Sequence, residues 1–141
     1  MNRSDISFHS DRSLPFNPDD INLWIREVID LENRKTGIIS YTFVDDEELL
    51  RINKDFLNHD FYTDIITFDE VVDTTINGEI FISLDRIKEN SLDTGSYQNE
   101  FLRVVVHGVL HLIGYDDHSS TEKLLMREKE DNYIELFHVK H

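Results

Sequence analysis

The segment from Phe101 to Ile113 would be apolar around most of its circumference if it formed a helix, yet it carries two histidines. Such a pattern predicts a helix that is buried inside the fold. A buried imidazole without a polar partner costs free energy. His107 and His111 therefore need partners within the protein. The apolar residues of this segment are Phe101, Leu102, Val104, Val105, Val106, Val109, Leu110, Leu112 and Ile113.

The spacing of these histidines indicates a metal site. Four residues of helix rise about 6 Å and return to nearly the same face, so His107 and His111 could hold one ion. Gly114 suits the left-handed conformation that ends helices, and the turn would bring His118 to the same ion. Three imidazoles with one open position are typical of a catalytic zinc. We therefore predict one Zn²⁺ per chain on His107, His111 and His118. Another divalent transition metal, or core histidines satisfied by hydrogen bonds, are the alternatives.

The composition restricts the remaining possibilities. The chain has no cysteine, which excludes disulfide partners and thiolate ligands. Its 141 residues predict a single domain, residues 1–141. No apolar run is long enough to span a membrane, and the amino terminus is polar, unlike a signal sequence. We expect a cytoplasmic protein without a membrane partner.

The pattern of strands and helices predicts an α+β fold, with a small mixed β-sheet packed with helices. The metal site would lie on the buried helix and in the loop that follows it. Strands are expected at residues 6–9, 38–44, 65–68 and 79–83. Helices are expected from residue 19 to a region ended by Gly37, at 45–58, 84–89 and 98–113, and from a cap at Ser119 or Ser120 onwards, with Glu122 completing a capping box.

The histidine segment resembles the signature of the YbeY family of metal-dependent endoribonucleases, bacterial proteins of rRNA maturation. That signature, His-Gly-x-Leu-His-Leu-x-Gly-Tyr-Asp-His, is matched from His107 through Asp116, after which this chain has one extra residue. By count, Asp117 occupies the position of the family's third ligand, whereas by chemistry His118 does. We expect His118, because a loop easily absorbs one residue.

Two further blocks resemble the family in the same order. Residues 52–69 lie in register with Leu-Asn-x-x-Tyr-Arg-x-x-Asp-x-Pro-Thr-Asp-Val-Leu-Ser-Phe-Pro, and residues 78–83 with Gly-Asp-Ile-x-Ile-Ser. Leu57 replaces an arginine for which the resemblance implies a phosphate contact, and Tyr62 and Asp69 replace prolines. The resemblance implies a zinc-dependent endoribonuclease that acts in rRNA maturation and ribosome quality control. Its partners would be rRNA and ribosome-associated proteins.

A zinc ion lowers the pKa of its bound water to about 7 and polarises a phosphoryl oxygen, which suits attack of metal-activated water on a phosphodiester. Gly108 stands where zinc proteases with a two-histidine helix carry their glutamate base, which argues against a peptidase. Asp116 and Asp117 are the nearest carboxylates. One of them is expected to act as a base towards metal-bound water or to orient a histidine, and the alternative is two loop aspartates facing solvent.

Charge is the feature that fits RNA least well. The chain has 14 basic and 29 acidic residues, a net charge of −15, which opposes attraction to a polyanion. Arg103, one turn before His107, is the candidate for a substrate phosphate contact. A salt bridge is the alternative that this composition favours. The charges of the last helix alternate in sign, as on a solvated face: Glu122, Lys123, Arg127, Glu128, Lys129 and Glu130.

Two other functions stay open. One is a ribosome-assembly binding factor in which the metal is structural, which the acidic charge, Leu57 and the absent glutamate favour. The other is a zinc hydrolase that acts on a substrate other than RNA.

Overall fold

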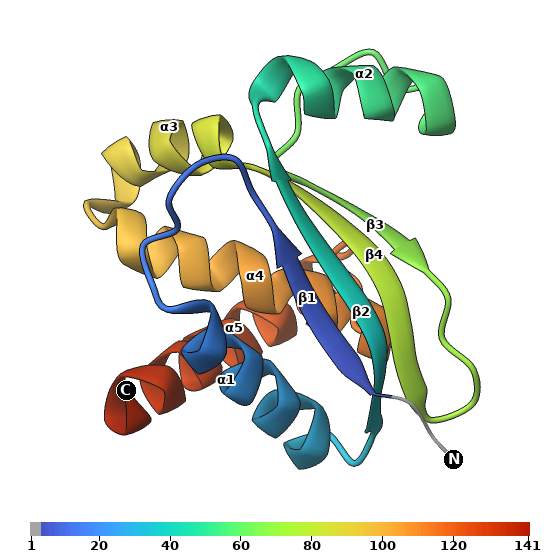
Figure 1. The fold of residues 1–141 in the computed structure, drawn as a ribbon, viewed down its shortest axis with the longest axis vertical. Helices are drawn as coiled ribbons and strands as arrows, with labels where there is room; N and C mark the ends of the chain where they lie inside the picture. The colour runs from blue at the N-terminus through green and yellow to red at the C-terminus, as the bar shows by residue number, and fades with distance from the viewer. Residues whose placement is uncertain (1–3) are drawn as a thin grey trace.

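A computed structural model describes residues 4–141 as a four-stranded mixed sheet with five helices (Figure 1). The strand order is β1-β2-β4-β3, in which β1, β2 and β4 run parallel and β3 is antiparallel to β4. The predicted α+β fold is confirmed. In chain order the elements are β1 (Asp5–His9), α1 (Pro18–Leu31), β2 (Lys35–Val44), α2 (Asp46–Leu57), β3 (Ile65–Asp69), β4 (Thr75–Ser83), α3 (Leu84–Thr94), α4 (Tyr97–Ile113) and α5 (Ser120–Lys140).

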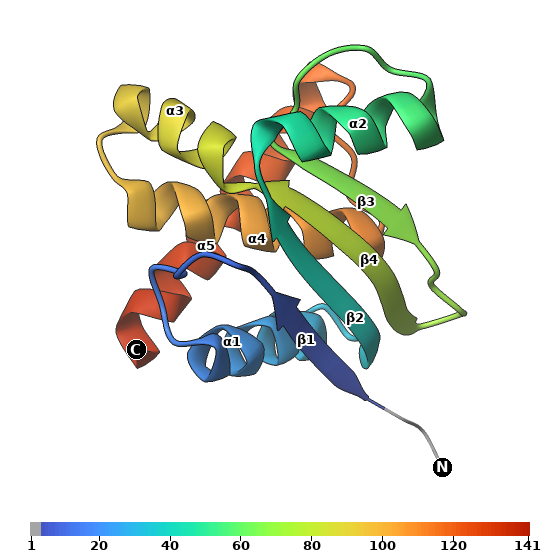
Figure 2. The same ribbon diagram turned by 45° about the horizontal axis from the view of Figure 1, so that its top comes forward.

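Helix α4 lies in the middle of the molecule. It packs against β3 and β4 on one side and against α1, α3 and α5 on others (Figure 2). Helix α1 packs against β1 and β2 on the same face of the sheet. The burial predicted for the apolar residues 101–113 of this helix is confirmed, and of these apolar residues only Ile113 is partly buried. The fully enclosed side chains are Phe101, Leu102, Val104, Val105, Val106, Val109, Leu110 and Leu112.

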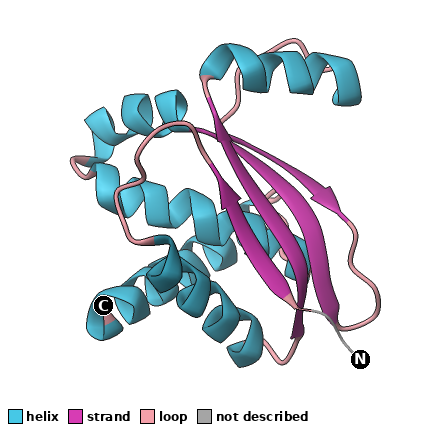
Figure 3. Cartoon of the chain, in the orientation of Figure 1, coloured by secondary structure: helices cyan, strands magenta, loops and turns pink. Residues whose placement is uncertain are grey.

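Helix α2 lies on the opposite face of the sheet (Figure 3). Its Leu49 and Ile52 form a separate small cluster with Ile66 of β3. Successive side chains of a strand point to opposite faces, so Ile66 faces α2 while its neighbour Ile65 faces α4. The sheet therefore has a large core on the α4 side and a small one under α2.

Strand β2 begins earlier than the sequence pattern predicted. It starts at Lys35, and Gly37 lies inside it at an irregularity of the pairing with β4, where it was expected to end a helical region. The Oδ1 atom of Asn77 accepts a hydrogen bond of 2.8 Å from the backbone N–H of Ile38. A Cβ atom on Gly37 would lie 2.1 Å from that oxygen, so a glycine is needed where the two strands come this close.

The start of α5 agrees with the boundary predicted from the sequence, and the extent of α3 differs from the prediction. Ser119 caps α5 and shares a capping box with Glu122, as predicted. Helix α3, which was predicted to begin with residues 84–89, continues to Thr94 and stops at Gly95 in the left-handed conformation. Within residues 4–141, no helix combines the length and the apolar character needed to cross a membrane.

Gly108 is the point at which α4 comes closest to the sheet. A Cβ atom at this position would lie 3.0 Å from Cδ1 of Ile65 and 3.1 Å from Cδ1 of Ile80. The position that carries the general base in two-histidine zinc proteases therefore faces an apolar strand surface in this fold.

We predict that Gly108→Glu, which would restore the protease pattern, destabilises the protein. The new carboxylate would be buried between two isoleucines without a partner, so the free energy of unfolding should fall by at least about 3 kcal/mol. Urea unfolding measures this change. Leu124→Glu adds the same charge at a position of α5 that is 73% exposed, and it should be nearly neutral. A Gly108→Glu variant as stable as the wild type would contradict the packing described.

Candidate metal centre

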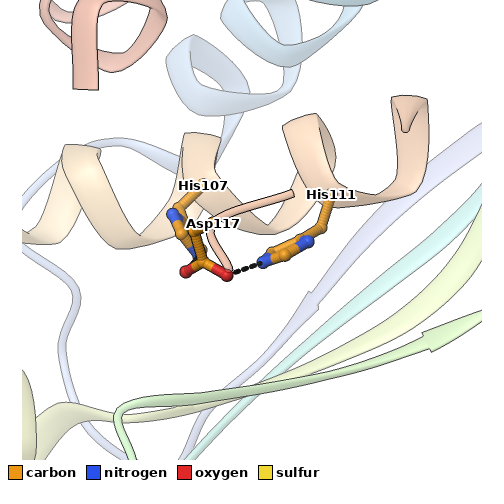
Figure 4. Close-up of side chains that lie close together, drawn as sticks. All are labelled: His107, His111 and Asp117. Carbon is orange, nitrogen blue, oxygen red and sulfur yellow. Dashed lines mark ion pairs between the residues drawn. The ribbon is translucent and has the colours of Figure 1, made fainter. Parts of the chain in front are cut away.

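Three potential ligands converge beside the C-terminal half of α4 (Figure 4). The rings of His107 and His111 project from one face of the helix, with centroids 4.7 Å apart and planes at 80°. Asp117 reaches both rings, with Oδ2 3.6 Å from Nε2 of His107 and Oδ1 3.7 Å from Nε2 of His111. One donor atom from each residue lies within 4.8 Å of the other two.

The loop after α4 delivers Asp117 because the helix ends sharply. Gly114 has a φ of 124°, and its N–H donates to the carbonyl oxygens of Leu110 and His111. The N–H of Tyr115 also donates to Leu110. These bonds turn the chain back towards the face of the helix that carries the histidines.

Glu32, the residue that caps the end of α1, fixes the position of this loop. Its carboxylate accepts hydrogen bonds from the hydroxyls of Tyr115 and Tyr133, and from Nζ of Lys129 at 3.1 Å. The ammonium group of Lys129 also lies 5.5 Å from the centre of the Tyr115 ring. The loop is therefore tied to α1 and α5 as well as to α4.

The structure places Asp117, and not His118, next to the two imidazoles. His118 has a side chain that is 82% exposed, and its Nε2 lies 3.8 Å from Oδ1 of Asp116. Asp116 is half exposed, with the same oxygen 3.8 Å from Nδ1 of His111. Asp117 stands at the position of the family's third ligand when residues are counted from His107. The structure therefore brings the residue that matches by count to the two imidazoles, and not the histidine that follows it.

Glu130 of α5 completes the surroundings of His107, and the sequence interpretation of it as a solvated residue was wrong. Its side chain is only 6% exposed, and Oε2 accepts a hydrogen bond of 2.6 Å from Nδ1 of His107. Residue 130 lies four positions after Met126 and four before Ile134, within the stripe of α5 that faces the core. A glutamate in an apolar stripe was the signal that could have revealed it.

Arg103 contacts the same carboxylate. Its Nη1 donates to Oε1 of Glu130 at 2.9 Å, and its Nη2 donates to Asp131 at 2.7 Å. Glu130 of α5 is therefore hydrogen-bonded to two residues of α4, Arg103 and His107.

These contacts shift the pKa values of the two imidazoles in opposite directions. Burial lowers the pKa of His107, but the hydrogen bond and the negative charge of Glu130 outweigh it, and the pKa is raised overall. Burial and the neighbouring His107 lower the pKa of His111. Since Nδ1 of His107 is engaged by Glu130, Nε2 is the nitrogen left free towards Asp117.

The donor set fits a divalent transition metal. Two imidazole nitrogens and a carboxylate oxygen are ligands that zinc accepts. The oxygens of Asp117 are farther from both Nε2 atoms than a hydrogen bond of about 3 Å allows, so the three groups converge without bonding one another. A cation among them would supply the missing interaction.

A cavity of about 360 Å³ adjoins this centre. Asp64, from the second block of family resemblance, lies on its wall just before β3, and burial raises the pKa of this carboxyl group. The fold thus brings the 52–69 block to the histidine helix. The lining residues are Asp64, Glu100, Arg103, Val104, His107, Asp117, Lys123, Met126, Arg127 and Glu130.

We predict that Glu130→Gln weakens Zn²⁺ binding by about 10- to 100-fold, because it removes the carboxylate that orients His107 and increases its basicity. Competition with a chromophoric chelator measures the affinity. Glu128→Gln makes the same change on an exposed face of α5 and should bind zinc like the wild type. Equal affinity of the two variants would show that Glu130 does not support the site.

Residues 5–138 match the family described as Endoribonuclease YbeY. The Endoribonuclease YbeY of Christiangramia forsetii is 42% identical over 141 residues, 99% of each chain. That of Flavobacterium psychrophilum is 48% identical over 118 residues, 83% of this chain and 84% of the other. The solution structure of TM1509 from Thermotoga maritima is similar with a TM-score of 0.69 and 25% identity, and the match covers 94% of this chain and 88% of that one. The chain belongs to the YbeY family of endoribonucleases.

Proposed function

We propose that this protein is a zinc-dependent endoribonuclease acting on rRNA in ribosome maturation and quality control, with its active site at the centre formed by His107, His111 and Asp117. The observation that carries the proposal is the convergence of these three groups at the edge of a cavity, in a member of a family named for endoribonuclease activity. Ribosome-associated proteins would be its partners, in the cytoplasm.

The proposed ligands are the two histidines of α4 and Asp117, in place of the third histidine expected from the sequence. Their mutual distances and the exposure of His118 support this choice. When bound, zinc would supply a Lewis acid for a phosphoryl oxygen and a water of lowered pKa. Asp116, beside Nδ1 of His111, would help to orient that ring.

For Arg103 we propose a positioning role instead of a phosphate contact. Both of its terminal nitrogens already donate to carboxylates, one of them the carboxylate that holds His107. Releasing the guanidinium to a substrate would leave Glu130 without its counterion in a buried position, which is costly.

The net charge of −15 keeps one other function in consideration, that of a binding factor in ribosome assembly whose metal is structural. An acidic protein approaches RNA poorly without help, and Leu57 lacks the charge of the arginine common in the family. A basic protein partner would serve such a factor. Cleavage assays separate the two functions.

We predict that Asp117→Ala loses its bound zinc and that His118→Ala retains it. Removal of one of three protein ligands leaves the ion with two, whereas the exposed His118 ring would not contact it. Metal analysis of the purified variants gives the result directly. Zinc retained in Asp117→Ala and lost in His118→Ala would return the third ligand position to His118.

We further predict that His111→Ala slows single-turnover cleavage of rRNA fragments by about 100-fold or more, because the metal contributes several kcal/mol to the stabilisation of charge at the phosphate. A chelator should have the same effect on the wild type. His118→Ala is the matched control and should cleave normally. If the wild type cleaves no RNA with zinc and ribosomal proteins present, the binding factor becomes the better interpretation.

A further inference from the structure

The cavity beside the metal centre runs along α4 towards its first turn. Glu100 lies on its wall seven residues before His107, which is two helical turns and about 10 Å along the axis, on nearly the same face. Two apolar side chains also line the cavity, Val104 from α4 and Met126 from α5. The cavity is therefore a lined recess with a metal-binding end and a carboxylate end.

Glu100 is a largely buried residue whose carboxylate oxygens are not fully enclosed, and the positive charges of Arg103 and Arg127 on the same cavity wall act on it. It is 8% exposed, and its side chain makes no hydrogen bond or ion pair with any of residues 4–141. Burial raises the pKa of this carboxyl group. Because this carboxylate lies on a cavity wall and accepts no hydrogen bond from the described residues, both of its oxygens are free to accept hydrogen bonds from a ligand.

Two cations lie on the same cavity wall. Lys123 and Arg127 are exposed on the first turns of α5, one turn apart, and form no ion pair within the described part of the chain. They add positive charge to this cavity wall in a protein with about twice as many acidic as basic residues. They suit the phosphates of a nucleic acid strand.

We propose that this cavity is a subsite for a guanine base of the RNA strand, adjacent to the phosphodiester at the metal centre, and that Glu100 is the residue that recognises it. The inference rests on the proposed nuclease function. Among the four RNA bases, only guanine presents two adjacent N–H donors, at N1 and N2, on one edge. These match the two oxygens of a carboxylate in a bidentate contact.

The other walls fit the rest of a nucleotide. Val104 and Met126 offer apolar surface to the faces of the base, while Lys123 and Arg127 lie where flanking phosphates would pass. The two helical turns between Glu100 and His107, about 10 Å along the axis, are comparable to the distance from a nucleotide's phosphate to the pairing edge of its base. Single-stranded RNA is commonly read in this way, by bases turned out of the stack into protein pockets.

Calorimetry of the zinc-loaded protein with the four 5′-mononucleotides tests the subsite. GMP should bind about ten-fold or more tightly than AMP, CMP and UMP. Glu100→Gln, which keeps the shape and removes the charge, should lose about ten-fold in GMP affinity and leave the other three unchanged. Glu128→Gln is the matched control and should retain the GMP preference. Inosine monophosphate, which lacks the N2 amino group, should bind the wild type about as weakly as AMP.

Equal affinity of the wild type for all four nucleotides, or an unchanged GMP affinity in Glu100→Gln with full zinc content, would overturn the subsite. The nuclease function has its own readout in RNA cleavage. A guanine preference in binding without any cleavage would support the proposed subsite and contradict the proposed nuclease function. Cleavage without a guanine preference would contradict only the proposed subsite.

Discussion

The burial of α4 is the constraint on which the rest of the molecule depends. The helix is covered by the sheet on one side and by α1, α3 and α5 on others, so most of its side chains from Phe101 onwards are apolar. Gly108 permits the close approach of the sheet, because any larger residue would meet Ile65 and Ile80. His107 and His111 lie on the side of the helix that faces Asp117 of the loop after it. The metal centre thus lies where the packing of α4 is incomplete.

Charge is distributed around this centre in a way that net charge does not reveal. Glu130 is buried between Arg103 and His107, which together neutralise it and hold it in place. A buried carboxylate is tolerated here because both of its oxygens have positively charged or donating partners. The same glutamate fixes which nitrogen of His107 faces Asp117. One ion-pair network therefore joins the packing of α5 to the chemistry of the site.

Much of the fold could be predicted from local patterns. Period and capping identified the helices, and the capping box at Ser119 is a purely local arrangement of hydrogen bonds. His107 and His111 could be identified because their spacing on one helix determines their distance. Asp117 could not be identified as their neighbour from the sequence. Its position depends on how Gly114 turns the chain and on how Glu32, 83 residues before Tyr115, holds that tyrosine. Glu130 was missed for a related reason, since its partner lies on another helix.

The attachment of Tyr115 to Glu32 has a consequence for how the site is acquired during folding. The two histidines come into proximity as soon as α4 forms, which is a local event. Asp117 reaches them only after the end of α1 and the middle of α5 have docked, because Tyr133 and Lys129 complete the same cluster of hydrogen bonds. A partly folded chain would therefore present two ligands without the third. High-affinity metal binding would then report that segments from both ends of the chain have reached their final places.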